Sequence, residues 1–511
     1  MIVLDNKNLI SKNVIYSVFT RVLILIIGLI VPRLLLVYFG SEINGLLSTV
    51  TQIFTYLALL EAGIGNSTMN ALYKPLDEKK FDIVNEILVE AKGYYRKVSF
   101  FYALGIIIFS TIYPFLVTST LSKWTISLII ILQGATNFIG YFFTSYYIQL
   151  LTASGYRYIS ENINFIIYVL TSIIKILLIV LGFNIVYVQL GFFLASLIKI
   201  PLINNYTKKK FNWLNLKGKS SKRRLKERGA FIVHEISGTI FNNTDVFIIS
   251  TFCSFSLASV YAVYNLVFGS LLTILTTAIS GLSYILGQSQ YKGIEKLRKI
   301  YDMYNILYLF ASFVIFTTGC VFVRPFVMLY TKNVNDINYF IPFLSLLFTL
   351  INLMSSSRAV GSLLINVSGN AEKTKYRSMA EAIINLLVSI VLVQIIGIYG
   401  VLVGTIIALI YRMNDIIIYS NKHILKRSLR DEYKYHIGNF TTFAVIYVAS
   451  NFINIQVYSI FDFLIKAVIG GLIVAFIFAI ENIIINKEVI KMFYQSILKI
   501  KKKEKNKNEF I

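Results

Sequence analysis

Long apolar runs alternate with short polar connections from one end of the 511-residue chain to the other. Each run has about 20 residues or more, enough for a helix to cross roughly 30 Å of hydrocarbon. We expect the first run to be retained, because it is too long for the apolar part of a signal peptide and no small-residue cleavage site follows it. The pattern predicts an all-α polytopic membrane protein with about fourteen transmembrane helices: 14–39, 44–70, 98–118, 124–151, 160–181, 184–206, 230–252, 257–287, 302–323, 338–367, 377–396, 399–420, 438–457 and 462–485.

The two halves of the chain resemble each other weakly. The segment "LLTASGYRYISENINF" (150–165) has a counterpart in "LLINVSGNAEKTKYRSMAEAIINL" (363–386). Six runs lie in each repeat, and an even number gives both halves the same orientation, related by an axis along the membrane normal. We therefore expect two pseudo-symmetric six-helix lobes and two additional C-terminal helices. The predicted segments are an N-lobe at 1–206, a basic cytoplasmic linker at 207–229, a C-lobe at 230–420, the last two helices within 421–485 and a basic cytoplasmic tail at 486–511.

The lysines and arginines are distributed unevenly among the connections. Only 14% of the residues are charged and 56% are hydrophobic, which excludes a soluble domain. Of the 49 lysines and arginines, 39 fall in alternate connections and the two ends, against 3 in the other connections. This bias predicts that both ends are cytoplasmic, and it explains the net charge of +24 without nucleic acid as a partner. The linker is expected to lie on anionic lipid headgroups; a specific partner site is the alternative.

Charged residues inside the apolar runs are the candidate functional groups. Lipid cannot satisfy them, so they normally face a bundle interior or a wet cavity. Lys199 and Lys466 lie near the ends of runs and can reach the interface, and Arg412 and Asp415 have the spacing of a pair on one helix. The full set contains seven bases, Arg21, Arg33, Lys175, Lys199, Arg358, Arg412 and Lys466, and four acids, Glu61, Asp245, Glu381 and Asp415.

Three runs also carry polar stripes at helical spacing. Such stripes predict the wall of a water-accessible lumen, with a static polar core as the alternative. The stripes are Ser355, Arg358, Ser362 and Asn366; Glu235, Gly238, Asn242 and Asp245; and Thr374, Ser378, Glu381 and Asn385.

The acids leave the coupling mechanism open. Glu61 precedes Gly63 and Gly65 and is predicted to lie within the membrane, where desolvation favours a protonated carboxyl. It is either a carrier of a coupling proton or the counter-ion of Arg21 or Arg358. Asp245 and Glu381 are candidates for the same roles. The two cysteines have no ligand-like spacing, so we expect no metal and no cofactor beyond an H⁺ or Na⁺ coupling ion.

The stretch "RVLILIIGLIVPRLLLVYFGSEINGLLSTVTQIFTYLALLEAGIGNSTMNALYKPL" (21–76) resembles the N-terminal signature of Wzx-type polysaccharide flippases. These belong to the MOP exporter superfamily, which also contains the MATE transporters. "YGVLVGTIIA" (399–408) and the fourteen-run plan extend the resemblance. It implies two lobes that alternate between inward-open and outward-open forms in a bacterial cytoplasmic membrane.

The resemblance also implies a substrate, an undecaprenyl-pyrophosphate-linked oligosaccharide used in surface polysaccharide assembly. Arg21 and Arg358, together with Arg33, are the positions that fit a cationic lumen for its headgroup, and the last two helices fit a groove for its lipid tail. Membrane lipids and other polysaccharide-assembly proteins are the implied partners. Guanidinium groups suit a pyrophosphate because they form charge-assisted, bidentate hydrogen bonds.

Two other functions remain open. A MATE-like multidrug or ion-coupled exporter would share the architecture but should carry cationic drugs. A membrane-embedded polysaccharide-assembly enzyme should have a sizeable external loop with acids or histidine, and the predicted outer connections are short and nearly uncharged. The chain also lacks a glycine-rich phosphate loop for ATP hydrolysis. We therefore expect a transporter and not an enzyme.

Overall fold

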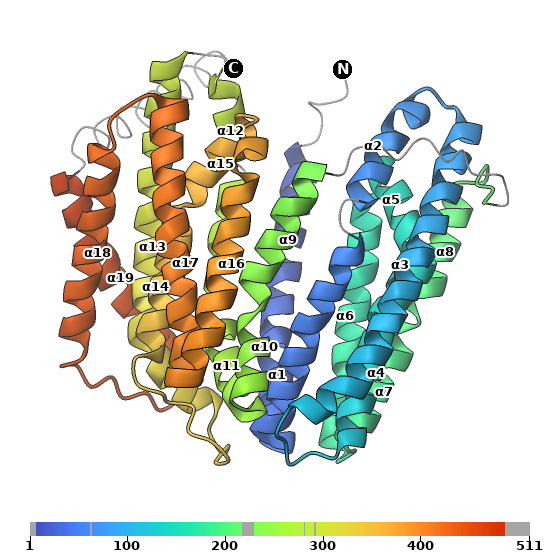
Figure 1. Ribbon diagram of the computed structural model, residues 1–511, viewed down its shortest axis with the longest axis horizontal. Coiled ribbons are helices and arrows are strands. Elements are labelled where there is room, and N and C mark those ends of the chain that lie inside the picture. Colours follow the sequence, from blue (N-terminus) through green and yellow to red (C-terminus); the bar gives the residue numbers. More distant parts are fainter. Residues whose placement is uncertain (1–6, 62–63, 217–228, 281, 291–292, 486–511) are drawn as a thin grey trace. The chain divides into compact units, whose positions relative to one another are not determined.

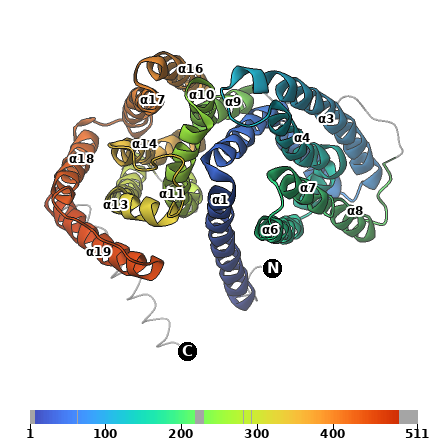
Figure 2. The same cartoon turned by 90° about the horizontal axis from the view of Figure 1, so that it is seen from below.

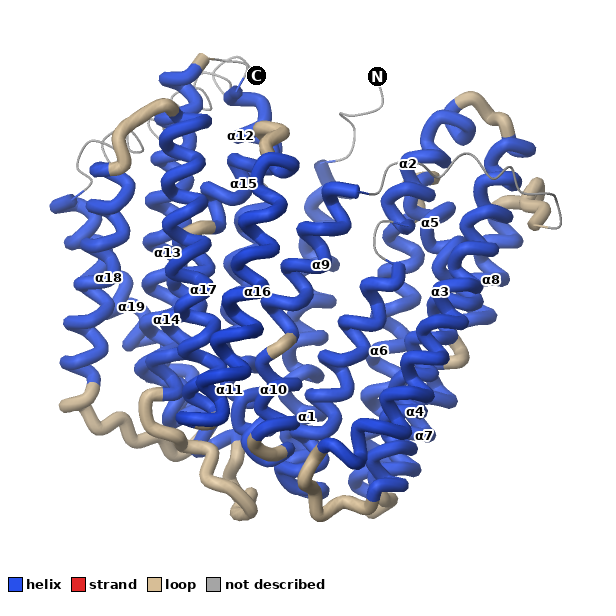
Figure 3. Tube along the Cα trace, viewed as in Figure 1, coloured by secondary structure: helices blue, strands red, loops and turns tan. Residues whose placement is uncertain are grey.

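The computed structural model describes residues 7–61, 64–216, 229–280, 282–290 and 293–485. All regular secondary structure in these ranges is helical (Figures 1 and 3), and eleven of the helical segments are long and apolar enough to cross a membrane. The predicted all-α membrane fold is confirmed. The eleven differ from the fourteen predicted runs because the first two runs form one segment, the seventh is divided at Thr244, and the thirteenth is more polar.

The described helices form two compact units. The first unit comprises Met1–Ala262 and Asn333–Ile337, and the second comprises Val263–Lys332 and Asn338–Ile511. The first contains α1 (Lys7–Ala58), η1 (Leu59–Glu61), α2 (Ile64–Asp77), α3 (Phe81–Leu116), α4 (Lys123–Ile139), η2 (Gly140–Thr144), α5 (Ser145–Ala153), α6 (Arg157–Val180), α7 (Ile185–Ser196), α8 (Lys199–Lys210), α9 (Gly229–Asn243), α10 (Asp245–Phe252) and the start of α11 (Phe255–Ser280).

A kink in α1 marks the end of the first apolar run. Gly40 has φ 80°, a conformation that favours glycine. The helix restarts at Ser41, whose backbone N–H and hydroxyl donate to the carboxylate of Asp336 at 2.6 and 2.7 Å. The carboxylate thus caps the second segment of α1, as an N-cap side chain would.

Close packing on α1 explains why the boundary between the units falls inside α11 and not in the 207–229 linker. A Cβ on Gly45 would lie 1.7 Å from the carbonyl oxygen of Phe255, so only glycine fits there. The neighbouring Asn44 amide donates at 2.8 Å to the hydroxyl of Ser259, one turn beyond Phe255 on α11. α9 and α10 also contact α1, and they therefore belong to the first unit.

The second unit is arranged around a long helix, α13. α14 packs on one part of α13 and on α17, which in turn packs along α16. The last two helices, α18 and α19, contact each other and α13 at one side of this unit (Figure 2). Its other elements are the rest of α11, α12 (Leu282–Ser289), α13 (Ile294–Tyr330), α14 (Leu344–Ser357), α15 (Ala359–Val367), α16 (Ala371–Ile396), α17 (Ile398–Tyr419), the π-helix η4 (Ser420–Leu425), α18 (Arg430–Ser450) and α19 (Ile460–Ile485).

Several helices extend well beyond their apolar runs. The stretch 71–97 is expected from its charges to be a connection, but α2 and α3 cover it except for residues 78–80. α13 likewise begins at Ile294, inside the predicted connection 288–301. Polar residues continue a helix readily once it is nucleated, because their backbone hydrogen bonds are made within the segment. The apolar pattern therefore locates the hydrophobic part of each helix but does not locate the helix ends.

Small residues bring α16 and α17 into contact. The "YGVLVGTIIA" segment places Gly400 and Gly404 one turn apart, in the small-xxx-small pattern that lets membrane helices approach closely. A Cβ on Gly400 would lie 2.2 Å from the carbonyl carbon of Leu392, and one on Gly404 would lie 2.3 Å from Ser389 Oγ. Both glycines are therefore required for this interface.

We predict that Gly400→Ala destabilises the protein by about 1–3 kcal/mol, the usual cost of overpacking, because its Cβ meets backbone atoms that cannot move aside. Unfolding in mixed detergent micelles measures the difference. Gly93→Ala is the control, since a Cβ at this exposed position on α3 has no neighbour within 4 Å. Equal stability of the two variants would contradict the close α16–α17 contact.

Candidate functional site

A break between two helices of the second unit presents Arg358. α14 ends at Ser357 and α15 begins at Ala359, with Arg358 as the residue between them. Its guanidinium Nη1 lies 2.5 Å from Glu381 Oε1 on α16. The predicted substrate residue therefore pairs with one of the predicted coupling acids.

The contacts continue from Glu381 across α16 and α17. Arg412 Nε lies 3.4 Å from Glu381 Oε2, and its Nη1 lies 2.5 Å from Asp415, the pairing that their spacing allows. The other oxygen of Asp415 accepts from Arg377 Nη1 at 2.5 Å. We refer to these five residues, Arg358, Glu381, Arg412, Asp415 and Arg377, as the arginine chain.

The arginine chain carries a net positive charge, because three guanidinium groups share two carboxylates. Its centre is closed to solvent and its ends are accessible: the Arg412 side chain is 6% exposed, whereas those of Arg358 and Arg377 are 19% and 40% exposed. A buried charge that loses its partner is strongly destabilising, so the centre has a structural role. The two ends are the groups that an anionic ligand can reach.

Two of the three polar stripes divide between the roles of polar core and lumen wall, and the third begins with Glu235, whose side chain lies outside the described residues. The stripe on α16 is buried, and its members bond to α17: Ser378 accepts from Arg412 at 2.7 Å, and Asn385 donates to Thr405 at 2.8 Å. It is a polar core and not a lumen wall. The stripe on α14 and α15 remains accessible, with Arg358 half-buried and Asn366 exposed.

The acids of the first unit have tyrosine partners. Glu61, at the end of η1, accepts from the Tyr95 hydroxyl at 3.0 Å, and Tyr95 also accepts from the Gln149 amide at 3.3 Å. Asp245, the first residue of α10, is buried and accepts from the Tyr261 hydroxyl at 2.9 Å. Their coupling role remains a prediction.

The two arginines of the first run differ in what the structure describes. Arg33 is half-buried in α1, and no residue in the described ranges forms a hydrogen bond or ion pair with it. Arg21 belongs to α1, but its side chain lies outside the described residues, so the proposed pair with Glu61 does too. Arg33 thus keeps a guanidinium available for a ligand.

An apolar groove of about 600 Å³ lies in the second unit between α13, α18 and α19. Aliphatic side chains form its walls, and Gly470 forms part of its floor, where a Cβ would lie 2.4 Å from the Phe322 ring. Lys466 lies at the groove, with its ammonium 2.9 Å from Asp462 and 2.8 Å from the Gln456 carbonyl oxygen. The groove could hold a hydrocarbon chain.

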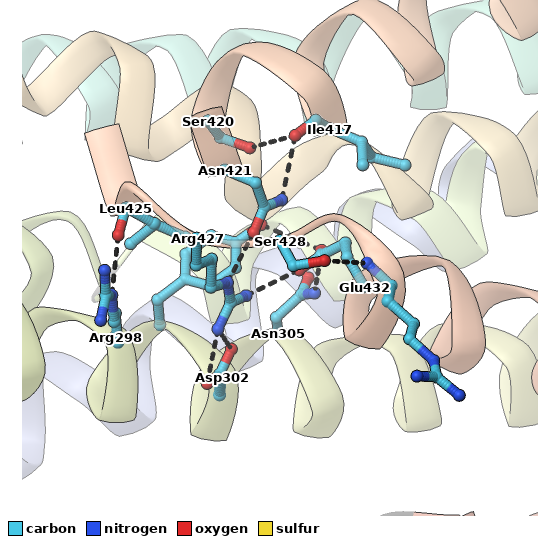
Figure 4. A network of polar contacts seen from close by, with 12 residues as sticks. Arg298, Asp302, Asn305, Ile417, Ser420, Asn421, Leu425, Arg427, Ser428 and Glu432 are labelled. Carbon is cyan, nitrogen blue, oxygen red and sulfur yellow. Dashed lines mark hydrogen bonds and ion pairs between the residues drawn. The ribbon is translucent and has the colours of Figure 1, made fainter. Parts of the chain in front are cut away.

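A network of polar contacts attaches α18, one wall of the groove, to α13 (Figure 4). Arg427 donates to both oxygens of Asp302 on α13 at 2.6 and 2.8 Å, and to Glu432 on α18 at 2.9 Å. Its Nε donates to Asn421 of η4 at 2.6 Å. Glu432 also accepts from Asn305 at 2.7 Å. Arg427 therefore ties three elements together.

Two of these residues, Arg377 of the arginine chain and Arg427 of the network around α13 and α18, are not predicted from the sequence as site residues. Arg377 is the first residue of its predicted run and is not among the seven bases assigned to the interior, although it is four residues before Glu381 and on the same side of the helix. Arg427 lies in the stretch 421–437, which reads as one of several basic connections. The signal available was the pair of acids that follows it, Asp431 and Glu432, in an otherwise basic segment.

No group of three or more His, Cys, Asp or Glu side chains that could hold a metal ion is found among the described residues. An H⁺ or Na⁺ coupling ion therefore stays a prediction that rests on Glu61, Asp245 and Glu381.

Comparison with known proteins finds solved structures of similar fold. No family model matches the chain, and no curated protein does. Among solved structures, the lipid II flippase MurJ in an inward closed conformation has a TM-score of 0.64 at 14% identity, over 95% of this chain and 100% of that chain.

Two MATE transporters are also similar. An inward-facing multidrug resistance MATE family transporter of the MOP superfamily has a TM-score of 0.60 at 14% identity, over 79% of this chain and 95% of that chain. The MATE multidrug transporter DinF-BH has a TM-score of 0.55 at 12% identity, over 83% of this chain and 98% of that chain. These structures are of transporters and a flippase, not of enzymes. The chain has the fold that they share.

We predict that Arg427→Ala destabilises the protein by about 3–5 kcal/mol at neutral pH, because it leaves the carboxylates of Asp302 and Glu432 without their shared cation. Thermal unfolding in detergent measures the change. Arg430→Ala is the control: Arg430 is exposed on the same connection. A similar loss in both variants would show that the network contributes nothing specific.

The difference in stability between wild type and Arg427→Ala should depend on pH. Burial by itself raises the pKa of Glu432, which precedes the apolar part of α18, but the neighbouring His436 and Arg427 outweigh burial and lower that pKa. A carboxyl with a lowered folded-state pKa stabilises the protein above its unfolded pKa of about 4.3, and this contribution is lost as the pH falls through the folded value. The gap between wild type and Arg427→Ala should therefore be full at neutral pH and shrink below about pH 4. A constant gap would contradict this.

Proposed function

We propose that this protein is a flippase that moves undecaprenyl-pyrophosphate-linked oligosaccharide repeat units across a bacterial cytoplasmic membrane for surface polysaccharide assembly. The observation that carries the proposal is the apolar groove formed with the two C-terminal helices in a unit that also contains a net-positive arginine chain. A lipid with a long hydrocarbon tail and an anionic headgroup needs both features.

The headgroup argument rests on charge. A pyrophosphate that leaves water loses its hydration, and fixed guanidinium groups can replace it with charge-assisted hydrogen bonds. Arg358 and Arg377 are accessible ends of the arginine chain, and Arg33 is available in the first unit. Cationic groups of this kind disfavour a cationic cargo, which argues against a multidrug exporter of the usual substrate type.

The tail argument rests on the last two helices. The similarity to the lipid II flippase covers 95% of this chain, whereas the two MATE transporters cover 79% and 83%. α18 and α19 lie at the C-terminal end of the chain and form two walls of the groove. The wider coverage supports a lipid-linked substrate, and alternating access is the mechanism that the shared fold suggests.

A MATE-like exporter is the second candidate. The similarity to multidrug transporters of this fold favours it, and the acids Glu61 and Asp245 are buried or half-buried in the first unit, where a coupling ion could act. The two candidates differ in the sign of the cargo and in the use of the groove.

The groove gives the first test. We predict that Ala449→Trp, which fills the groove from α18, lowers surface polysaccharide in cells that depend on this protein, because the lipid tail can no longer enter. The matched control is Val448→Trp, since Val448 is an exposed neighbour on α18 that does not line the groove. If both variants restore wild-type polysaccharide at equal expression, the groove does not hold the substrate.

The arginine chain gives the second test. We predict that Arg358→Ala abolishes export and that Arg358→Lys retains part of it, because losing one charge-assisted hydrogen bond costs about 1.5–3 kcal/mol, or roughly ten- to a hundredfold in binding. The Arg358→Ala/Glu381→Gln double variant removes both charges of the pair and keeps an acceptor beside Arg412, so it should be more stable than Arg358→Ala but should remain inactive. Recovery of export in the double variant would reduce Arg358 to a structural partner of Glu381.

A further inference from the structure

The first unit contains a polar cavity that the headgroup and tail arguments do not use. It has a volume of about 350 Å³ and lies between α4, η2, α5, α6, α7 and α8. Hydroxyl and amide side chains from several helices line it, among them Asn137, Thr144, Asn164, Tyr168 and Ser196. Its size is at the lower end for small-ligand pockets, which suits a single small polar molecule.

A π-helix shapes one wall of this cavity. η2 (Gly140–Thr144) follows directly from α4, and both of its end residues line the cavity. The carbonyl of Gly140 accepts the backbone N–H of Ser145 in this wider turn, and the hydroxyls of Thr144 and Ser145 also donate to it at 2.9 and 3.2 Å. A Cβ on Gly140 would have no neighbour within 4 Å, which means that the space beside it is open. Single π turns inside α-helices are frequent at functional sites.

One cation lines the cavity. Lys199 lines it, is half-buried, and forms no hydrogen bond or ion pair with any described residue. The acid on the facing helix, Glu161 of α6, attracts Lys199 electrostatically, but its ion pair is with Arg157 at 3.3 Å. A second lysine, Lys175, lies with its ammonium 3.8 Å from the ring centroid of Phe192, which also lines the cavity.

Amide groups in the wall are placed to bind hydroxyls. Asn164, like Lys199, has no hydrogen-bond partner among the described residues and offers both a donor and an acceptor. The Asn137 amide donates to the Tyr102 hydroxyl at 3.0 Å. An aromatic ring, several hydroxyls, a free amide and one cation match the needs of a sugar ring that carries a carboxylate. The ring face packs on the aromatic, the hydroxyls bond to the amide, and the carboxylate meets the ammonium.

We propose that the cavity beside η2 binds an acidic sugar residue, with Lys199 as the counter-charge of its carboxylate. This assignment rests on the proposed function, since it names the class of saccharide that the flippase would carry: a repeat unit that contains a uronic acid. It places a carboxylate beside a lysine that forms no hydrogen bond or ion pair with any described residue.

Binding of soluble sugars to the purified full-length protein in detergent tests this proposal without requiring transport. The probes are methyl glucuronide and its neutral match, methyl glucoside, measured by saturation-transfer NMR. We expect wild type to bind the glucuronide about ten- to a hundredfold more tightly, the range of one charge-assisted hydrogen bond. Lys199→Met should lose this preference and Lys199→Arg should keep it.

Two further variants keep the test decisive if Lys199→Met does not fold. Asn164→Asp preserves the shape of the wall and adds a negative charge, so it should weaken glucuronide binding more than glucoside binding and reduce the preference for the glucuronide. Lys123→Met, on the exposed start of α4, should change neither. Equal binding of the two sugars by wild type, or unchanged preference in Lys199→Met and Asn164→Asp, would overturn the proposal. An equal response to glycerol phosphate would also overturn it and would assign the cavity to lipid headgroups.

The outcomes separate this inference from the proposed function. If reconstituted protein flips the pyrophosphate lipid but shows no preference for the glucuronide, the acidic-sugar site is wrong and the flippase stands. If the preference is found but no lipid is flipped, the sugar site stands and the proposed function fails.

Discussion

Arg412 holds the second unit together because a guanidinium inside a membrane helix must find all its partners within the protein. Its three nitrogens face Ser378, Glu381 and Asp415, and the contacts with Ser378 and Glu381 join α17 to α16. An unpaired arginine at this depth costs a few kcal/mol even on the mildest scale. The glycines at 400 and 404 let α17 approach α16 closely. The contacts of Arg412 with α16 therefore depend on the close helix packing that these glycines allow.

The same constraint explains why the ends of the arginine chain are available for function. Two carboxylates cannot neutralise three guanidinium groups, so the excess positive charge is left at the positions with the greatest exposure, Arg358 and Arg377. The break between α14 and α15 leaves Arg358 half-buried at the edge of the core. A positive group that is already paired costs less to keep in the membrane than a free one, and it can still receive an anion.

Much of this could be predicted from the sequence, for physical reasons. The lengths of the apolar runs predict most of the helices that are long enough to cross a membrane. The Gly-xxx-Gly pattern at 400–404 is visible in the segment that carries the family resemblance. The pairing of Arg358 with Glu381 was not predictable, because it joins two helices whose relative rotation no periodicity sets. The same holds for Arg427, whose partners lie on α13 and α18.

The buried stripe on α16 illustrates what a sequence pattern cannot predict. A row of polar residues at helical spacing predicts a polar face, but the identity of what covers that face depends on the neighbouring helix. Thr405 and Arg412 on α17 meet it, and they make it a core. The groove along α18 and α19 was expected only through the family resemblance, since an apolar helix face that lines a groove has the same sequence pattern as one that faces lipid.

Flipping in sealed proteoliposomes tests the central claim most directly. The purified protein would be reconstituted with an undecaprenyl-pyrophosphate lipid that bears a fluorescent oligosaccharide, and a membrane-impermeant quencher would report the fraction in the outer leaflet. We predict protein-dependent movement of this lipid between leaflets and no transport of a cationic dye under the same gradients. Export of the dye without movement of the pyrophosphate lipid would contradict the account and favour a multidrug exporter.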